Sequence, residues 1–186
     1  MKIIGGEHKG RNFYMPAGIK STQGLVRAAI FDLLGHDVRG LSFLELYAGS
    51  GAVGLEAVSR GAGEVIMVEK DPKNAQVIRD NCALLSLDMG RQVKVLEADA
   101  LATVKALGGK QERFDIVFLD PPYRRRLLKK TLKVINDNDI LHPQSFVVAQ
   151  YDKSERLEIP KQLKVVLERR YGNSYLTIFQ KVMNNA

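Results

Sequence analysis

The amino-acid sequence predicts an α/β protein: a mostly parallel seven-stranded sheet with helices on both faces, preceded by an N-terminal β-hairpin extension. Three observations support this fold class. Strand-like and helix-like patterns alternate through most of the chain. A glycine-rich turn joins the first of these strands to the helix that follows it. The apolar run 114–119 ends at two prolines, which is typical of a strand buried on both faces of a parallel sheet.

The first 20 residues are expected to form a basic extension, and residues 21–186 the main domain. Glycines separate short apolar pieces in the extension, and this pattern favours a β-hairpin or a hooked arm. Its Lys9 and Arg11 could hold a phosphate backbone. A solvated arm is the alternative interpretation.

The main domain is expected to open with a helix at 22–34, because apolar residues recur there at helical spacing and Gly35 follows. Five strands are then expected at 41–47, 64–69, 93–97, 114–119 and 145–150. The intervening helices are expected at 53–60, 72–85, 100–107 and 125–135. Strands that alternate with helices pair in parallel through right-handed crossovers. Two final strands, at 163–169 and 175–180, are expected to form an antiparallel pair around a Gly172-Asn173 turn.

Composition restricts the classes of function. The net charge of +7 and the pI near 9.5 favour a polyanionic partner. No apolar run has the length of a transmembrane helix or of a signal peptide, so we expect a cytoplasmic protein with no membrane partner. The single cysteine, Cys82, excludes an internal disulfide, and the three histidines are scattered, so no metal is predicted. We expect a monomer.

The fourth strand ends at Asp120-Pro121-Pro122-Tyr123. The two prolines remove two backbone donors and fix two φ angles, so the strand must stop there. In open α/β sheets ligands bind beyond the carboxyl ends of the strands. The four residues therefore form a candidate catalytic clamp, with a carboxylate and an aromatic ring held by a stiff turn. A purely structural turn is the alternative.

A second candidate site follows the first strand of the main domain. Gly49, Gly51 and Gly54 match the spacing G-x-G-x-x-G between a strand and a helix, and Glu69 ends the next strand. Glycines let the backbone approach a ligand closely, and the start of the helix adds amide donors. A carboxylate at Glu69 can accept both hydroxyls of a ribose. The pattern indicates a nucleoside cofactor, and a nicotinamide dinucleotide fits it as well.

Two further acidic residues favour S-adenosylmethionine. Glu45 stands just before the glycine turn, where it can meet the ammonium group that nicotinamide dinucleotides lack. Asp99 follows the third strand and can accept a hydrogen bond from an adenine amine, with Ala100 beside it. Either acid taken alone is also typical of a helix cap.

Together these motifs resemble the class I S-adenosylmethionine-dependent methyltransferases, whose fold is Rossmann-like. A narrower resemblance is carried by Ile3 to Gly6, Lys9 to Arg11, Val26 to Phe31, Leu46 to Ala57, Val68 to Asp71, Asp99-Ala100, Phe114 to Tyr123 and Arg169 to Gly172. These segments are similar to those of the RsmD-type family of bacterial 16S (small-subunit) ribosomal RNA guanine-N2 methyltransferases. They cover nearly the whole chain in the family's order.

The resemblance implies which residues bind the cofactor and what they act on. The implied S-adenosylmethionine site comprises Glu45, Tyr47, Ala48, Gly49, Ser50, Gly51, Glu69, Lys70, Asp99 and Ala100. The implied substrate is ribosomal RNA, either free or in an assembled small-subunit particle. The sequence departs from the family's pattern at Lys20-Ser21-Thr22, Gly24-Leu25, Glu45 and Gln150.

The chemistry implied is displacement of a methyl group by an exocyclic amine. We expect the Asp120 carboxylate and the Pro121 carbonyl to accept the two N–H groups of the amine, and Tyr123 to stack on the base. A basic run follows the clamp, and it is expected to contact phosphates, with a solvated helix face as the alternative. The candidate RNA-binding residues are Lys9, Arg11, Arg27, Arg124, Arg125, Arg126 and Lys129.

Three other functions fit parts of the pattern. A nicotinamide-dependent oxidoreductase would explain the glycines and Glu69 but would leave the 120–123 clamp without a role. A methyltransferase of DNA adenine-N6 or of a protein glutamine amide could use a similar clamp. A catalytically weakened RNA-binding relative would be consistent with the altered segment at 20–25.

Overall fold

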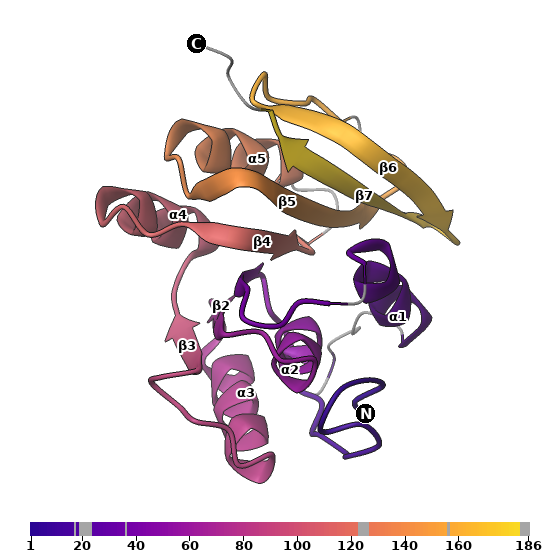
Figure 1. Cartoon of the computed structure of the whole chain (residues 1–186), viewed down its shortest axis with the longest axis vertical. Coiled ribbons are helices and arrows are strands. Elements are labelled where there is room, and N and C mark those ends of the chain that lie inside the picture. Colours follow the sequence, from indigo (N-terminus) through magenta and orange to yellow (C-terminus); the bar gives the residue numbers. More distant parts are fainter. Residues whose placement is uncertain (17, 19–23, 36, 123–126, 156, 183–186) are drawn as a thin grey trace.

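The computed structural model describes residues 1–16, 18, 24–35, 37–122, 127–155 and 157–182. A seven-stranded sheet forms the middle layer of three, with α1, α2 and α3 on one face and α4 and α5 on the other (Figure 1). The strand order is β3-β2-β1-β4-β5-β7-β6. The first five strands in this order are mutually parallel, while β7 is antiparallel to both of its neighbours, so the sheet is mixed.

The strands are β1 (Ser42–Leu46), β2 (Glu64–Glu69), β3 (Val93–Glu97), β4 (Phe114–Leu119), β5 (Leu141–Asp152), β6 (Leu163–Tyr171) and β7 (Ser174–Lys181). The helices are α1 (Gly24–Leu33), α2 (Ala52–Ser59), α3 (Pro72–Leu84), α4 (Ala100–Gly109) and α5 (Leu127–Asp137). The helices and strands expected after the N-terminal extension are confirmed in type and order. The largest difference is in β5, which begins four residues earlier than expected and continues to Asp152 opposite Ser174. Its first part includes a proline and exposed polar residues, which do not read as a strand.

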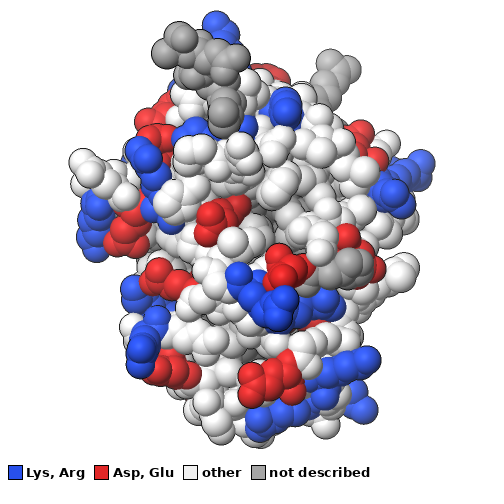
Figure 2. Space-filling model, in the orientation of Figure 1, with Lys and Arg blue, Asp and Glu red and all other residues white. Residues whose placement is uncertain are grey.

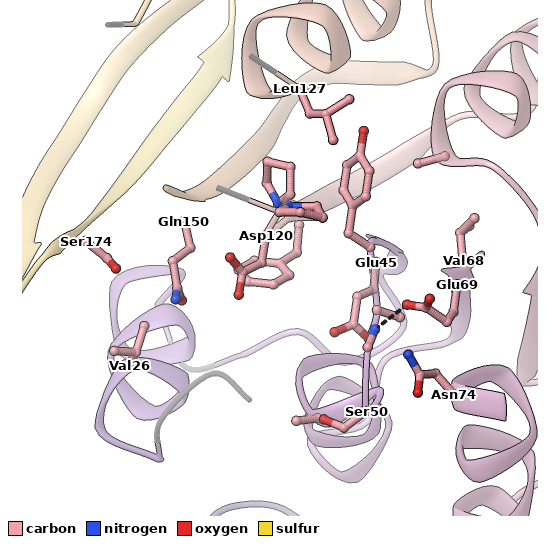
Figure 3. A pocket seen from close by; sticks show the side chains of 18 of the residues that line it. Val26, Glu45, Ser50, Val68, Glu69, Asn74, Asp120, Leu127, Gln150 and Ser174 are labelled. Carbon is pink, nitrogen blue, oxygen red and sulfur yellow. Dashed lines mark hydrogen bonds between the residues drawn. The ribbon is translucent and has the colours of Figure 1, made fainter. Parts of the chain in front are cut away.

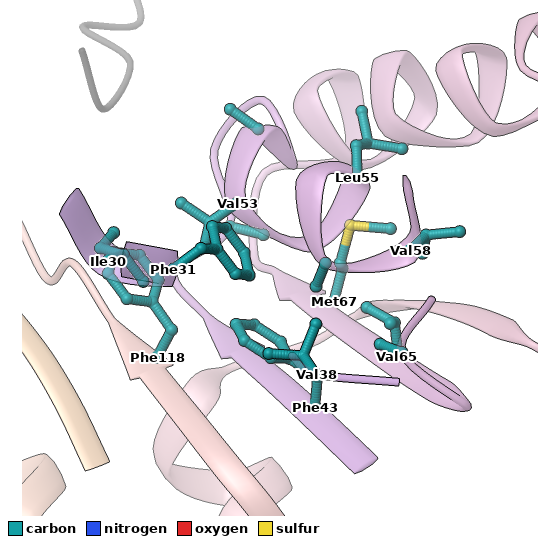
Figure 4. Packing of buried hydrophobic residues seen from close by; sticks show 14 of the residues in the cluster. Ile30, Phe31, Val38, Phe43, Val53, Leu55, Val58, Val65, Met67 and Phe118 are labelled. Carbon is teal, nitrogen blue, oxygen red and sulfur yellow. The ribbon is translucent and has the colours of Figure 1, made fainter. Parts of the chain in front are cut away.

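Successive residues of the central strands enter two separate cores. Phe43 packs with Phe31 and with the apolar side of α2 (Figure 4), whereas the next residue, Leu44, packs under α4 and α5. A parallel strand covered on both faces needs apolar side chains at nearly every position, and this explains the continuous apolar runs in the sequence.

The strand order reverses next to β1, which has β2 on one side and β4 on the other. Crossover helices leave this point on opposite faces of the sheet, so the loops after β1 and β4 separate and open a crevice. The turn 47–51 follows β1, and Asp120 follows β4. The topology therefore places the glycine turn and the Asp-Pro-Pro turn at one edge of the sheet.

The expected N-terminal β-hairpin is not confirmed. The described part of the segment contains one isolated antiparallel bridge, between Lys2 and Asn12, and no extended strand pair. Ile3 and Phe13 are buried in the core beneath α1 and α2. The Ile4 amide donates to Glu56 Oε2 at 3.0 Å, which holds the segment against α2.

Candidate active site

A cavity of about 1180 Å³ opens at the carboxyl ends of β1, β2 and β4. Figure 3 shows that Asp120 lies between two groups of lining side chains, with Glu69 and Asn74 on one side and Gln150, Ser174 and Val26 on the other. The turn between β6 and β7 contributes Gly172 and Asn173 to the second side. Segments far apart in the sequence thus share one cavity.

The β1–α2 turn is shaped by two glycines with positive φ, Gly49 at 57° and Gly51 at 70°. Side chains other than glycine rarely adopt this left-handed conformation. The Gly49 amide donates to Glu69 Oε2 at 2.7 Å, and the Asp71 amide donates to Glu69 Oε1 at 2.8 Å. Each oxygen of a carboxylate can accept a second hydrogen bond, so Glu69 keeps acceptor capacity toward the cavity. Ser50 is buried in the same turn.

Glu45, near the end of β1, is buried against the start of α2. Its Oε2 accepts a hydrogen bond from the Gly54 amide at 2.8 Å. Burial raises its pKa to about 8, the charges of Asp120 and Glu69 add to this rise, and the two backbone amides of Gly54 and Val53 oppose it. Among the described residues no lysine or arginine forms an ion pair with Glu45. Arg27 is near enough for the charge of Glu45 to act on its pKa, but within these ranges Glu45 itself is held only by backbone amides.

Asp99, Lys70, Ala100 and Tyr47 also line the cavity. Asp99 Oδ1 caps α4 by accepting from the amides of residues 101 and 102 at 3.0 and 3.1 Å, and Oδ2 lies 3.5 Å from Lys70 Nζ. These amides, with Lys70, lower the pKa of Asp99. The Tyr47 hydroxyl is hydrogen-bonded to Thr131 at 2.6 Å, which fixes the ring at the cavity wall.

The Asp120-Pro121-Pro122 turn lines the cavity directly after β4. Asp120 is half-buried, Pro121 is buried and Pro122 is exposed. The predicted fourth member of the clamp, Tyr123, lies outside the described residues. Asp120 is close enough to Glu45 for its charge to raise the pKa of the Glu45 carboxyl. The two predicted sites therefore form one cavity.

The predicted RNA-binding residues are in different environments. Lys9 is exposed, and Lys129 is exposed in an ion pair with Glu158. Arg11 is exposed, but its guanidinium donates to the carbonyl oxygens of Leu84 and Leu85 at the end of α3. Arg124, Arg125 and Arg126 lie outside the described residues.

Arg27 requires a correction, because its side chain is not on the surface. It is only 1% exposed, its Nη2 donates to the Lys2 carbonyl at 2.8 Å, and its guanidinium lies over the Phe13 ring. Burial lowers its pKa, while the charges of Glu56 and Glu45 oppose this effect. In this structure Arg27 holds the N-terminal segment and cannot reach a phosphate.

Several lining residues were not predicted as site residues from the sequence. Asn74, on the first turn of α3, and Asp152, at the end of β5, carried no motif. In the sequence, Gln150 stands out only because it departs from the family's pattern. The segment from Arg170 to Ser174 matched a family motif, but no role followed from that match. Sequence patterns do not reveal that β7 pairs with β5 and thereby places the β6–β7 turn at the carboxyl end of β5.

Two features are absent from the part of the chain that the structure describes. No helix there is long and apolar enough to cross a membrane. No group of three or more histidine, cysteine or acidic side chains within the same ranges could hold a metal ion.

Comparisons with known proteins agree with this geometry. The model of the family described as "Conserved hypothetical protein 95" matches residues 1–180. The chain is 33% identical over 184 residues to "Putative rRNA methyltransferase YlbH" of Bacillus subtilis, covering 97% of this chain and 99% of that protein. It is 30% identical over 184 residues to "Ribosomal RNA small subunit methyltransferase D" of Escherichia coli K12, covering 97% and 90%. A solved structure, "Putative methyltransferase yhhF from Escherichia coli", superposes with a TM-score of 0.86 at 29% identity and 97% coverage of both chains.

The family match and the full-length relatives agree with the motifs in the sequence. The chain therefore belongs to the family described as Conserved hypothetical protein 95, the RsmD-type family of small-subunit ribosomal RNA methyltransferases.

Proposed function

We propose that this protein is an S-adenosylmethionine-dependent methyltransferase that modifies the exocyclic N2 amine of a guanine in 16S ribosomal RNA. The observation that carries the proposal is the single cavity shared by the Asp120 turn, the glycine turn and Glu69. An oxidoreductase would need the glycine turn and Glu69 but would have no use for Asp120. The full-length likeness to small-subunit rRNA methyltransferases supports the choice of substrate.

The residues on the Glu69 side of the cavity fit the proposed cofactor. Most of their charged groups are acceptors, namely the carboxyl groups of Glu45, Glu69 and Asp99. S-adenosylmethionine carries a positively charged ammonium, a sulfonium and two ribose hydroxyls, and all of these favour acceptors or negative charge. Glu45 is a buried carboxyl that forms no ion pair among the described residues, and an ammonium would supply one. Glu69 retains lone pairs for hydroxyl donors.

We assign the other cofactor contacts by their place in the cavity. Tyr47, Ala48, Gly49, Ser50 and Gly51 form the turn beside Glu69, and Lys70, Asp99 and Ala100 form the wall after β2 and β3. Asp99 Oδ1 is already used as a helix cap, so its second oxygen, which faces Lys70, is the one left for an adenine amine.

Asp120 and Pro121 position the reacting amine. The bound cofactor supplies an electrophilic methyl group, so the protein's main task is orientation. The Asp120 carboxylate accepts one N–H of the amine and the Pro121 carbonyl accepts the other, which directs the nitrogen lone pair toward the methyl group. The charge of Asp120 also stabilises the positive charge that develops on nitrogen. Pro122 keeps the turn rigid, and Tyr123 stacks on the base.

The remaining assignments concern partners and location. Lys9, Arg11, Lys129 and the run 124–126 are proposed to contact the RNA backbone. The RNA is either free or part of an assembled small-subunit particle. We propose that the protein acts in the cytoplasm as a monomer, without membrane or metal, and that residues 1–20 form an extension of the catalytic domain at 21–186.

The role of Asp120 is tested with Asp120→Asn, which keeps the shape of the side chain and removes its charge. Transfer of a tritiated methyl group to small-subunit RNA from cells lacking this protein should fall by about 100-fold or more. Cofactor affinity, measured by calorimetry, should stay within about threefold. Asp88→Asn, an exposed acid that does not line the cavity, serves as the control and should keep the wild-type rate.

Transfer at the wild-type rate by Asp120→Asn would exclude the proposed role. Mass spectrometry of digested 16S RNA from cells with and without the protein would identify the methylated nucleotide. A methyl group that depends on the protein but lies on a ring nitrogen or on an adenine would contradict the guanine-N2 assignment.

A further inference from the structure

Glu45, Asp120 and Gln150 project from one face of the sheet. Along β4 and β5, Phe118 and Val148 pack in the core under α1 and α2, whereas the next residues, Leu119 and Ala149, pack in the opposite core. Alternation along a strand then returns Asp120 and Gln150 to the first face. Leu119 pairs with Ala149 in the parallel register, so Asp120 and Gln150 follow side by side on neighbouring strands.

Gln150 is a buried polar side chain whose acceptor has no partner among the described residues. It is 9% exposed, and its Oε1 accepts no hydrogen bond within those ranges. It lines the cavity, and in Figure 3 its side chain points into the same space as Asp120. A buried acceptor left unpaired costs free energy, so this site favours a ligand that brings a donor.

Asp120 divides the cavity, and Gln150 lies on the side away from Glu69 (Figure 3). The other lining residues on that side are Val26, Ser174 and the β6–β7 turn. If the cofactor occupies the Glu69 side, as proposed above, the substrate base occupies the side of Gln150. The ring atom beside the reacting amine would then face β5, the strand that contains Gln150.

The atom next to the N2 amine on the Watson–Crick edge of guanine is the ring nitrogen N1, which carries a hydrogen. Guanine therefore has two adjacent donors, the N2 amine and N1–H. The protein has two adjacent acceptors, the Asp120 carboxylate after β4 and Gln150 Oε1 on β5. In 2-aminopurine the same exocyclic amine is present, but N1 is an acceptor. A site that offers Gln150 Oε1 to N1 distinguishes the two bases at the position beside the reaction.

We propose that Gln150 determines base specificity: its Oε1 accepts the N1–H of the target guanine while Asp120 holds the amine. This inference rests on the proposed function. Gln150 positions and selects the base, and it takes no part in the transfer of the methyl group.

The test compares two substrates that share the reacting amine. Small-subunit RNA is prepared by splint ligation with either guanine or 2-aminopurine at the mapped position, and kcat/KM is measured for both. Gln150→Leu keeps the size of the side chain without its acceptor and should reduce the preference for guanine by about tenfold or more, the effect of one hydrogen bond. Gln150→Glu has only acceptors and should keep or increase the preference.

Ser145→Ala is the matched control. Ser145 is on the same strand and is also buried, with an Oγ that has no partner among the described residues, but it does not line the cavity. It should leave the guanine preference unchanged. Equal loss of activity on both RNAs in Gln150→Leu would show a structural role only and overturn the inference. No transfer to either RNA by the wild-type protein would instead contradict the proposed function, so the two failures are distinguishable.

Discussion

Of the carboxylates that line the candidate site, Glu45, Glu69 and Asp120 have different surroundings. Glu69 accepts two backbone hydrogen bonds that hold the glycine turn and the start of α3. Asp120 stands on a proline-stiffened turn and is half-buried. Glu45 is fully buried, with only backbone amides to offset the loss of water. Burial in an apolar environment disfavours the charged form of a carboxyl group, and it is the main cause of the raised pKa of Glu45.

The raised pKa of Glu45 predicts a specific pH dependence of stability. Its pKa is about 8 in the folded protein against an ordinary value near 4.5, so the folded state binds the proton more tightly. The resulting stabilisation is complete below pH 4.5 and is lost as the pH rises toward 8, by up to about 1.4 kcal/mol per pH unit. Glu45→Gln cannot ionise. In the cofactor-free protein, the fall in melting temperature between pH 5.5 and 8.5 should therefore be smaller in Glu45→Gln than in the wild type.

The same measurement can also contradict the predicted titration of Glu45. If wild type and Glu45→Gln lose stability in parallel over this pH range, the carboxyl of Glu45 does not titrate there. Binding of a cationic cofactor should also release protons from the wild type near pH 7. Calorimetry in two buffers with different ionisation enthalpies would detect this release, which should be absent from the glutamine variant.

At the scale of the element, the start of α2 depends on close packing between a strand and a helix. A Cβ atom on Gly54 would lie 2.6 Å from Glu45 Oε2 and 2.6 Å from the Met67 side chain. Because Gly54 also donates its amide to Glu45, the helix can approach β1 only if this position has no side chain. This explains the third glycine of the motif by packing.

Gly54→Ala should therefore destabilise the protein by about 1–3 kcal/mol, the usual cost of overpacking, and should weaken cofactor binding by displacing Glu45. Urea denaturation and calorimetry measure the two effects. The control is Gly109→Ala at the end of α4, where an added Cβ meets nothing within 4 Å. That change should alter the free energy of unfolding by no more than about 0.5 kcal/mol. Equal effects of the two substitutions would contradict the packing argument.

At the scale of the whole molecule, the net charge of +7 does not form one continuous basic field on the face shown in Figure 2. Lysine and arginine side chains there alternate with aspartate and glutamate, and several basic side chains of the molecule are in ion pairs such as Lys129 with Glu158. RNA binding is therefore expected to depend on particular basic clusters more than on the total charge. The run 124–126, which follows the Asp120-Pro121-Pro122 turn in the sequence, is the main candidate.

Replacement of Arg124, Arg125 and Arg126 by alanine should weaken RNA binding and reduce its salt dependence. Each lost phosphate contact lowers the slope of log K against log salt by about 0.7–0.9, or roughly two units for three contacts. The control replaces Lys73, Lys105 and Lys110, which are exposed, do not line the cavity and change the net charge equally. The slope is measured by filter binding at several salt concentrations. Equal slopes for both triple variants would assign the effect to net charge alone.

Much of the fold was predictable because its signals are local. Apolar runs of strand length, helical spacing of apolar residues and glycine or proline stops placed every strand and helix within a few residues, except for the early start of β5. The N-terminal segment was not predicted well. Its glycines suggested a hairpin, but its two arms pair only around the single Lys2–Asn12 bridge. The Ile4 and His8 amides between them donate to Glu56 and Ser59 of α2.

The sequence by itself determined the class of fold, the family and the two turns that meet at the cavity, because backbone geometry at those turns demands glycine and proline in a fixed order. Only the tertiary structure decided which side chains meet. It buried Arg27 and brought Gln150 beside Asp120, and both outcomes depend on contacts between distant segments. Such contacts arise from the order of the strands and the packing of helices across them, so local sequence patterns do not predict them.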